Sequence, residues 1–187
     1  MEKRRGLGAS TSRRLLRQRL PFRAVNCRGD PDFEPGVQRH HLLPRQLLSQ
    51  QCFGAMFEAI GCDRLGLDDF RQNGLLLPGN GESAVRMGLP LHRGPHRAYN
   101  GMVAERVGQI EATWVRVRPL APESALEQAL MRLSLLQRAL RRRLLGADRP
   151  RLRLNNRDPL GAGLDFAELD AMAEALWRGT DEAISAQ

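Results

Sequence analysis

Aromatic residues, cysteines and long hydrophobic runs are all scarce in this sequence. Only 5% of its 187 residues are aromatic, so we expect a core built mainly from leucine and alanine. The three cysteines are odd in number and form no CxxC pair, which excludes a disulfide framework and favours reduced thiols in the cytoplasm. No apolar run approaches the length of a membrane span, and the N-terminus lacks the apolar segment of a secretory signal. We therefore expect no membrane association.

The net charge of +8 is concentrated at the N-terminus. Residues 1–24 contain eight basic side chains and one acidic side chain, which leaves the rest of the chain at only +1. Glycine, serine and threonine among the arginines predict a flexible basic arm, which could bind nucleic acid through phosphate contacts. A solvated tail, or an overlong start of the reading frame, would have the same composition. Both interpretations stay open.

Hydrophobic periodicity predicts short strands followed by longer helices. A strand, a turn and a second strand are expected between Ala24 and Leu43, and a tight bend at 67–74 should lead into a buried strand that ends at Pro78. A loop with one helical turn is expected at 79–90. Residues 151–160 should be irregular or a short strand. The predicted helices span 44–61, 95–111, 122–146 and 165–177.

All four histidines fall into two tight pairs. His40 and His41 are adjacent at the end of a predicted strand, and His92 and His96 are four residues apart in the segment HRGPH. Imidazole is the commonest side-chain ligand for zinc-like metals and the base best matched to neutral pH. Scattered core or surface histidines would not be expected to pair in this way, so the pattern indicates a metal site.

Other motifs occur in a fixed order around these pairs. Pro44 follows the first pair after two leucines, the segment DFRQNG at 69–74 precedes an aliphatic strand, and AYN at 98–100 follows the second pair. In this order the sequence resembles the HNH/endonuclease VII superfamily, the ββα-metal or His-Me finger nucleases. Residues 36–111 are most similar to the AHH nucleases of bacterial polymorphic toxins. One departure is Arg39, where the family name implies alanine.

The resemblance implies a small ββα-metal nuclease core. Together with the predicted helices, it gives an α+β fold with a predominantly helical C-terminal region. We therefore divide the chain into a basic arm at 1–23, a nuclease domain at 24–112 and a helical extension at 113–187, and the resemblance does not extend to the last of these. The implied activity is hydrolysis of phosphodiester bonds in nucleic acid, with DNA favoured over RNA. A role as a bacterial toxin or effector, with a cognate immunity protein as partner, is also implied. Such a protein would be cytoplasmic, or would be secreted by a route without a signal peptide.

The resemblance also assigns roles to individual residues. His40, His92 and His96 would hold one divalent ion, His41 would act as general base, and Asn73 would orient the base or the loop that carries it. Strand alternation alone permits either order of ligand and base at the first pair. Three imidazoles without an obvious carboxylate favour zinc, nickel, cobalt or manganese, with magnesium weaker.

Four arginines flank the histidines and could contact phosphate groups, although surface arginines are common: Arg39, Arg45, Arg93 and Arg97. The alternative function is a non-catalytic, zinc-stapled nucleic-acid-binding protein, in which all four imidazoles hold the ion and no base is left. A further alternative is an inactive interaction protein built around the helix at 122–146.

A few other residues have simple structural interpretations. Asp68 and Asp69 are expected to cap a turn or a helix start rather than to bind metal. Tyr99, the only tyrosine, is expected to pack on its helix. Cys52 and Cys62 are expected in the core, since no acid–base partner lies near them in the sequence.

Overall fold

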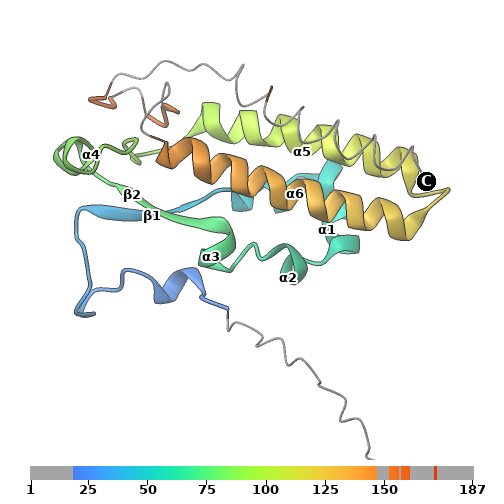
Figure 1. Cartoon of the computed structure of the whole chain (residues 1–187), viewed down its shortest axis with the longest axis horizontal. Coiled ribbons are helices and arrows are strands. Elements are labelled where there is room, and N and C mark those ends of the chain that lie inside the picture. Colours follow the sequence, from blue (N-terminus) through green and yellow to red (C-terminus); the bar gives the residue numbers. More distant parts are fainter. Residues whose placement is uncertain (1–18, 147–151, 156, 161–170, 172–187) are drawn as a thin grey trace, which may run out of the picture.

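The computed structural model describes residues 19–146, 152–155, 157–160 and 171 (Figure 1). This part of the chain combines one two-stranded sheet with helices, which confirms the expected α+β class. Residues 1–18 of the expected arm and the helix expected at 165–177, apart from Ala171, lie outside the described residues. The elements are the 3₁₀ helix η1 (Phe22–Ala24), β1 (Val37–His41), the 3₁₀ helix η2 (Arg45–Ser49), α1 (Gln51–Ile60), α2 (Cys62–Leu65), α3 (Phe70–Asn73), β2 (Gly74–Pro78), α4 (Gly81–Met87), α5 (Arg97–Val117) and α6 (Pro122–Leu145).

The sheet consists of β1 paired antiparallel with β2. In its register Val37 faces Pro78 and His41 faces Gly74, so the histidine pair lies at the end of the sheet that leads out of α3. Successive side chains of a strand point to opposite faces. His40 is accordingly buried at 3% exposure, whereas His41 on the other face is partly exposed.

The first strand expected after Ala24 is absent from the described structure, and β1 pairs with β2 instead. Residues 25–36 form a loop closed by Asn26, which has a positive φ of 52°. Its side chain accepts a hydrogen bond from the Glu34 N–H and donates to the carbonyl oxygens of Glu34 and Val37. Prolines at 31 and 35 also remove backbone donors that a sheet would need. The hairpin prediction was wrong for this reason.

Two of the expected helices have different bounds in the structure. Pro44 is extended and is followed by η2, so that α1 begins only at Gln51; it ends where Gly61 adopts a φ of 80°. Helix α5 continues to Val117 because Ile110 and Trp114 keep its buried face in the core. The expected domain boundary after residue 112 therefore falls inside this helix, and the division into domains stays a prediction.

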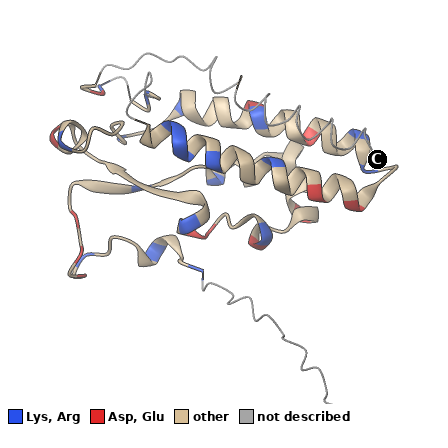
Figure 2. Cartoon of the chain, in the orientation of Figure 1, with Lys and Arg blue, Asp and Glu red and all other residues tan. Residues whose placement is uncertain are grey.

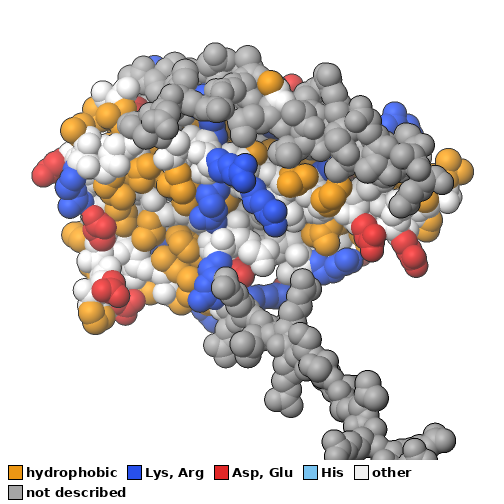
Figure 3. Space-filling view, viewed as in Figure 1, with side chains coloured by type: hydrophobic (Ala, Val, Ile, Leu, Met, Phe, Trp, Pro, Cys, Tyr) orange, Lys and Arg blue, Asp and Glu red, His pale blue; other side chains and the backbone are white. Residues whose placement is uncertain are grey.

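Helices α5 and α6 run side by side, and α1 packs against both (Figure 1). The core between them and the sheet is mainly leucine and alanine, as expected, with Phe53, Phe57, Tyr99 and Trp114 among its aromatic members. Along α6, acidic side chains lie near the start and arginines near the end, which complements the helix dipole (Figure 2). Basic side chains therefore gather over the C-terminal half of α6 on the face that Figure 3 shows.

None of the helices in the described ranges is sufficiently long and apolar to cross a lipid bilayer.

Candidate metal centre and active site

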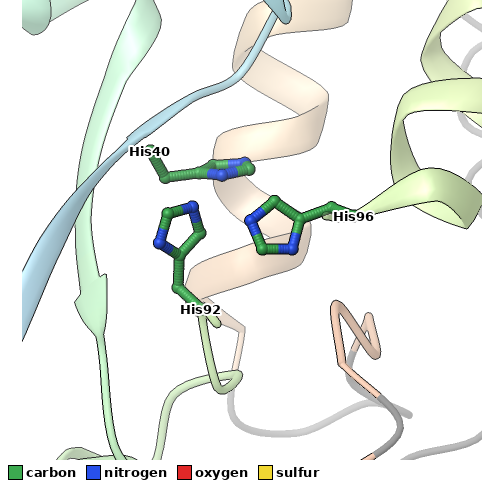
Figure 4. Close-up of side chains that lie close together, drawn as sticks. All are labelled: His40, His92 and His96. Atoms are coloured by element: carbon green, nitrogen blue, oxygen red, sulfur yellow. The ribbon is translucent and has the colours of Figure 1, made fainter. Parts of the chain in front are cut away.

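Three imidazoles from separate parts of the fold converge on one point (Figure 4). His40 comes from β1, His92 from the loop after α4, and His96 is the N-cap residue of α5. One ring nitrogen from each lies within 4.8 Å of the other two. The sheet and the start of a long helix thus bring together residues more than fifty positions apart.

The donor set fits a divalent ion of the zinc type. The buried Nε2 atom of His40 has no hydrogen-bond partner among the described residues. In His92 the Nδ1 atom faces Oε1 of Gln38 at 3.2 Å, and in His96 the Nδ1 atom faces the carbonyl oxygen of Leu154 at 3.4 Å. An oxygen acceptor at Nδ1 places the proton there and leaves the Nε2 lone pair for a metal. Three neutral nitrogen ligands leave further coordination positions open.

Burial keeps these imidazoles uncharged. It lowers the pKa of His40 well below its usual value, and the neighbouring His92 and His96 lower that pKa further. Burial also lowers the pKa of His92 to about 4. The pKa of His96 is lowered by burial and partly restored by the contact with Leu154. The three imidazoles are therefore neutral at neutral pH, which is the form in which histidine binds a metal.

His41 lies on the opposite side of the strand and outside this cluster. Its ring is stacked on Phe22, with centroids 3.7 Å apart and planes within 3° of parallel. Its pKa is lowered to about 4, first by burial and then by Arg45 and Arg39, while Asp68 acts in the opposite direction. The four histidines therefore form a set of three and a separate neutral imidazole, not a closed four-ligand site.

Asn73 is fully buried at the end of α3. Its Oδ1 accepts a hydrogen bond from the Leu43 N–H at 2.8 Å, and its Nδ2 donates to the carbonyl oxygens of Leu43 and Leu67. Asn73 was expected to orient either the imidazole of the base or the loop that carries it. These contacts reach the loop that follows His41, and none reaches an imidazole. The residue ties the chain after the histidine pair to the turn before α3.

Tyr99 supports the same loop from α5. Its hydroxyl donates to the Leu42 carbonyl oxygen at 2.7 Å, and its ring makes an edge contact with His40 at 4.9 Å between centroids. Burial raises the pKa of Tyr99, so the hydroxyl keeps its proton as a donor. Tyr99 is a packing residue, as expected, but its hydrogen bond to the loop was not anticipated.

The four arginines singled out in the sequence lie at two places. Arg39 donates to the Phe22 carbonyl oxygen at 2.7 Å. Arg45 lines a hollow that also contains three aspartates, at 63, 68 and 69. Arg93 and Arg97 line a second hollow, of about 490 Å³, together with Arg153 and Arg157. The second hollow has four guanidinium groups and no acidic lining residue, so it is the better place for phosphate.

Other site residues were missed or misplaced by sequence reasoning. Gln38 was missed, although its position two residues before His40 on the same strand predicts the same face. No local motif in the sequence indicated that Arg153 and Arg157 would lie at this hollow. Asp69 is confirmed as a cap, since its carboxylate accepts the Arg71 N–H at 3.0 Å. Both cysteines expected in the core, at 52 and 62, are exposed, so that prediction was wrong. They lie at the starts of α1 and α2, on the helix faces turned from the core.

Comparison with known proteins adds an independent finding. A sequence model of the AHH family, a nuclease family of the HNH/ENDO VII superfamily with a conserved AHH motif, matches residues 23–133. The chain belongs to the AHH nuclease family. Searches of the curated proteins and of the solved structures gave no match.

Membership makes this chain a nuclease with a nucleic-acid substrate, and nucleases of the HNH superfamily use a divalent metal. The family match extends beyond the segment quoted from the sequence, because it includes all of α5 and the first half of α6. In this AHH nuclease Arg39 replaces the alanine of the conserved motif. The side chain of Arg39 lies on the same strand face as His41. It donates a hydrogen bond to the carbonyl oxygen of Phe22, the residue that stacks on His41.

Proposed function

We propose that this nuclease is a metal-dependent endonuclease that hydrolyses phosphodiester bonds, with DNA preferred over RNA. One observation carries the proposal: three neutral imidazoles meet at one point, and a fourth neutral imidazole lies apart from them. Hydrolysis of a phosphodiester needs both a cation and a base, and this arrangement provides a place for each.

In this proposal His40, His92 and His96 hold the ion. A divalent ion bound there supplies positive charge to the phosphoryl oxygen and to the leaving 3′ oxygen. The ligands themselves are neutral, so the charge of the ion is not cancelled by the protein. Zinc, nickel, cobalt and manganese suit nitrogen ligands better than magnesium does.

His41 is the proposed general base. It accepts a proton from the attacking water while the water oxygen forms a bond to phosphorus and the bond to the 3′ oxygen breaks; the leaving oxygen then takes a proton from solvent. The low pKa of His41 keeps the ring unprotonated at neutral pH. Asn73 is a positioning residue in this scheme, because it fixes the backbone that follows His41.

Arg93 and Arg97 are the proposed contacts to the substrate backbone beside the metal ligands. The hollow that they share with Arg153 and Arg157 continues directly from the loop that carries His92 and His96. Phosphate contacts of this kind position a nucleic acid without reading its sequence. Arg39 and Arg45, on the His41 side, are proposed to contact phosphate as well, and the N-terminal arm to add further sequence-independent affinity.

The zinc-stapled alternative requires His41 to act as a fourth ligand. The separation of His41 from the cluster, and its stacking on Phe22, favour the nuclease over a closed staple. The toxin or effector role and the immunity partner rest on the family resemblance alone. Co-expression with the neighbouring gene tests that role, since an immunity protein would suppress the cleavage and bind the nuclease.

The proposed activity is tested with closed circular plasmid, which an exonuclease cannot attack. Metal-free protein is loaded in turn with zinc, nickel, cobalt, manganese and magnesium, and is incubated with plasmid and with single-stranded RNA. We expect nicked circles with at least one of the first four ions, and no cleavage after chelation. Faster cleavage of RNA than of DNA would reverse the substrate preference. The proposal fails if none of the loaded forms cleaves either substrate.

A further inference from the structure

A short segment beyond the family match contacts the loop that carries two of the metal ligands. The match ends at residue 133, whereas this segment consists of residues 152–155 and 157–160. Leu152 and Leu154 anchor it in the core, at 2% and 6% exposure. The segment is irregular, as predicted, but its polar groups are directed at residues 91–96.

Asp158 is the central residue of this contact. It is 7% exposed, and one carboxylate oxygen accepts the Leu91 N–H at 3.0 Å. The other oxygen accepts the Leu160 N–H at 3.0 Å, which holds the carboxylate in place. An acidic group at this depth is unusual unless it is hydrogen-bonded in this way. Leu91 immediately precedes His92.

Two further contacts hold the same loop. The side-chain amide of Asn155 donates to the carbonyl oxygen of Arg93, one residue after His92. The carbonyl oxygen of Leu154 lies 3.4 Å from Nδ1 of His96. From the other side, the His92 N–H donates to the Pro78 carbonyl oxygen at 2.7 Å. The loop belongs to no helix or strand, so these contacts replace the backbone hydrogen bonds that a regular element would provide.

We propose that Asp158, Asn155 and the carbonyl group of Leu154 are positioning groups for the metal centre, which they complete from outside the family's matched region. Asp158 fixes the backbone before His92, Asn155 fixes the backbone after it, and Leu154 fixes the ring orientation and tautomer of His96. Partners of this kind around metal ligands typically change metal affinity by about 10- to 100-fold when they are removed. The inference rests on the proposed function, because it takes these histidines to be ligands.

The test measures the affinity for zinc by competition with a chromophoric chelator, and the visible spectrum of the cobalt-loaded protein. Asp158→Ala should weaken zinc binding by about 10- to 100-fold and alter the cobalt bands, while cleavage recovers at saturating metal. Asp158→Asn keeps one oxygen acceptor for the Leu91 N–H and should recover most of the affinity. Asp30→Ala, which removes an exposed carboxylate elsewhere, is the charge-matched control and should bind zinc as the wild type does.

Urea denaturation of each metal-free variant separates positioning from folding. If Asp158→Ala is not folded, Asn155→Ala decides, because it removes a contact from a partly exposed residue and should weaken zinc binding in the same direction. Unchanged zinc affinity in the folded Asp158→Ala variant, or in Asn155→Ala where that one decides, overturns the inference while the wild type still binds zinc and cleaves. Absence of zinc binding in the wild type would instead overturn the metal site itself.

Discussion

Gln137 donates a hydrogen bond from Nε2 to Oδ1 of Asn73 at 3.2 Å, across 64 positions of sequence. Both side chains are buried, at 4% and 0% exposure. With this bond the side-chain amide of Asn73 accepts two hydrogen bonds and donates two. All four of its hydrogen-bonding positions are therefore satisfied. Helix α6 thereby supports the loop that follows His41 from a position just past the family match.

Replacing Gln137 by methionine should therefore destabilise the protein more than a surface change would. The substitution keeps the volume and removes the side-chain amide, which leaves one acceptor position of Asn73 unfilled and also removes the longer hydrogen bond to the Leu65 carbonyl oxygen, at 3.4 Å. We expect the free energy of unfolding to fall by about 1–2 kcal/mol, measured by urea denaturation. Gln128→Met, on a less buried turn of the same helix, is the control and should change stability by less than about 0.5 kcal/mol. If both variants lose the same free energy of unfolding, the hydrogen bond from Gln137 to Asn73 does not contribute the stability proposed for it.

His41→Ala and His40→Ala should fail in different ways. If His41 is the base, its removal keeps the metal and the fold but lowers cleavage by about 100- to 10,000-fold. His40→Ala should lower metal affinity together with activity, and excess metal should partly restore it. Metal content and plasmid nicking are measured for both variants from parallel preparations. Loss of the ion from His41→Ala, with retention in His40→Ala, would reverse the two assignments.

The stability of the metal-free protein should depend on pH. Burial lowers the pKa of His41 and of His92 to about 4, whereas an unfolded histidine titrates near 6.5. Between these values the unfolded chain binds more protons than the folded protein, so the free energy of unfolding should decrease as the pH falls from about 6.5 toward 4. Urea denaturation at pH 7.5, 6.5 and 5.5, in the presence of chelator, measures the slope. His92→Gln should show a smaller slope, and a flat wild-type profile would contradict the burial of these rings in solution.

Substitution of Arg93 and Arg97 by glutamine should change the salt dependence of DNA binding. Each lost phosphate contact should reduce the slope of log K against log salt by about 1, so the double variant should lose about 2. Fluorescence anisotropy on duplex DNA, in the presence of chelator to prevent cleavage, gives the slope. Arg116→Gln lies nineteen residues from Arg97 along α5, roughly 28 Å away, and is the control. If the salt dependence of binding is the same for the double variant and the control, this hollow does not contact the DNA backbone.

The sequence pointed to the three clustered histidines because the pairing of all four histidines, and the motifs around them, resemble a nuclease family. His40 is the penultimate residue of β1, and His96 caps a long periodic helix after Pro95. Both features can be read within a few residues. The hairpin before β1 was wrong because the side chain of Asn26, rather than a turn between strands, closes the loop.

The groups around the ligands could not be predicted in the same way. Asp158 and Leu91 are 67 residues apart, and the partner of His96 is a backbone carbonyl, which has no residue-specific signature. The stacking of Phe22 on His41 depends on how the chain before β1 returns to α3, where the Phe70 N–H donates to the Leu20 carbonyl oxygen at 2.7 Å. Such contacts follow from tertiary packing and not from local periodicity.

The concentration of every histidine at one place has a spectroscopic consequence. The chain contains four histidines, three in the candidate metal site and His41 on the opposite side of β1, stacked on Phe22. A sample labelled with isotopes only in histidine would therefore give imidazole resonances from the site alone, without background from the rest of the protein. Tautomer, protonation and metal ligation of each ring could then be followed in the intact chain, and the ring of His41 would be marked by the shielding of the Phe22 ring above it.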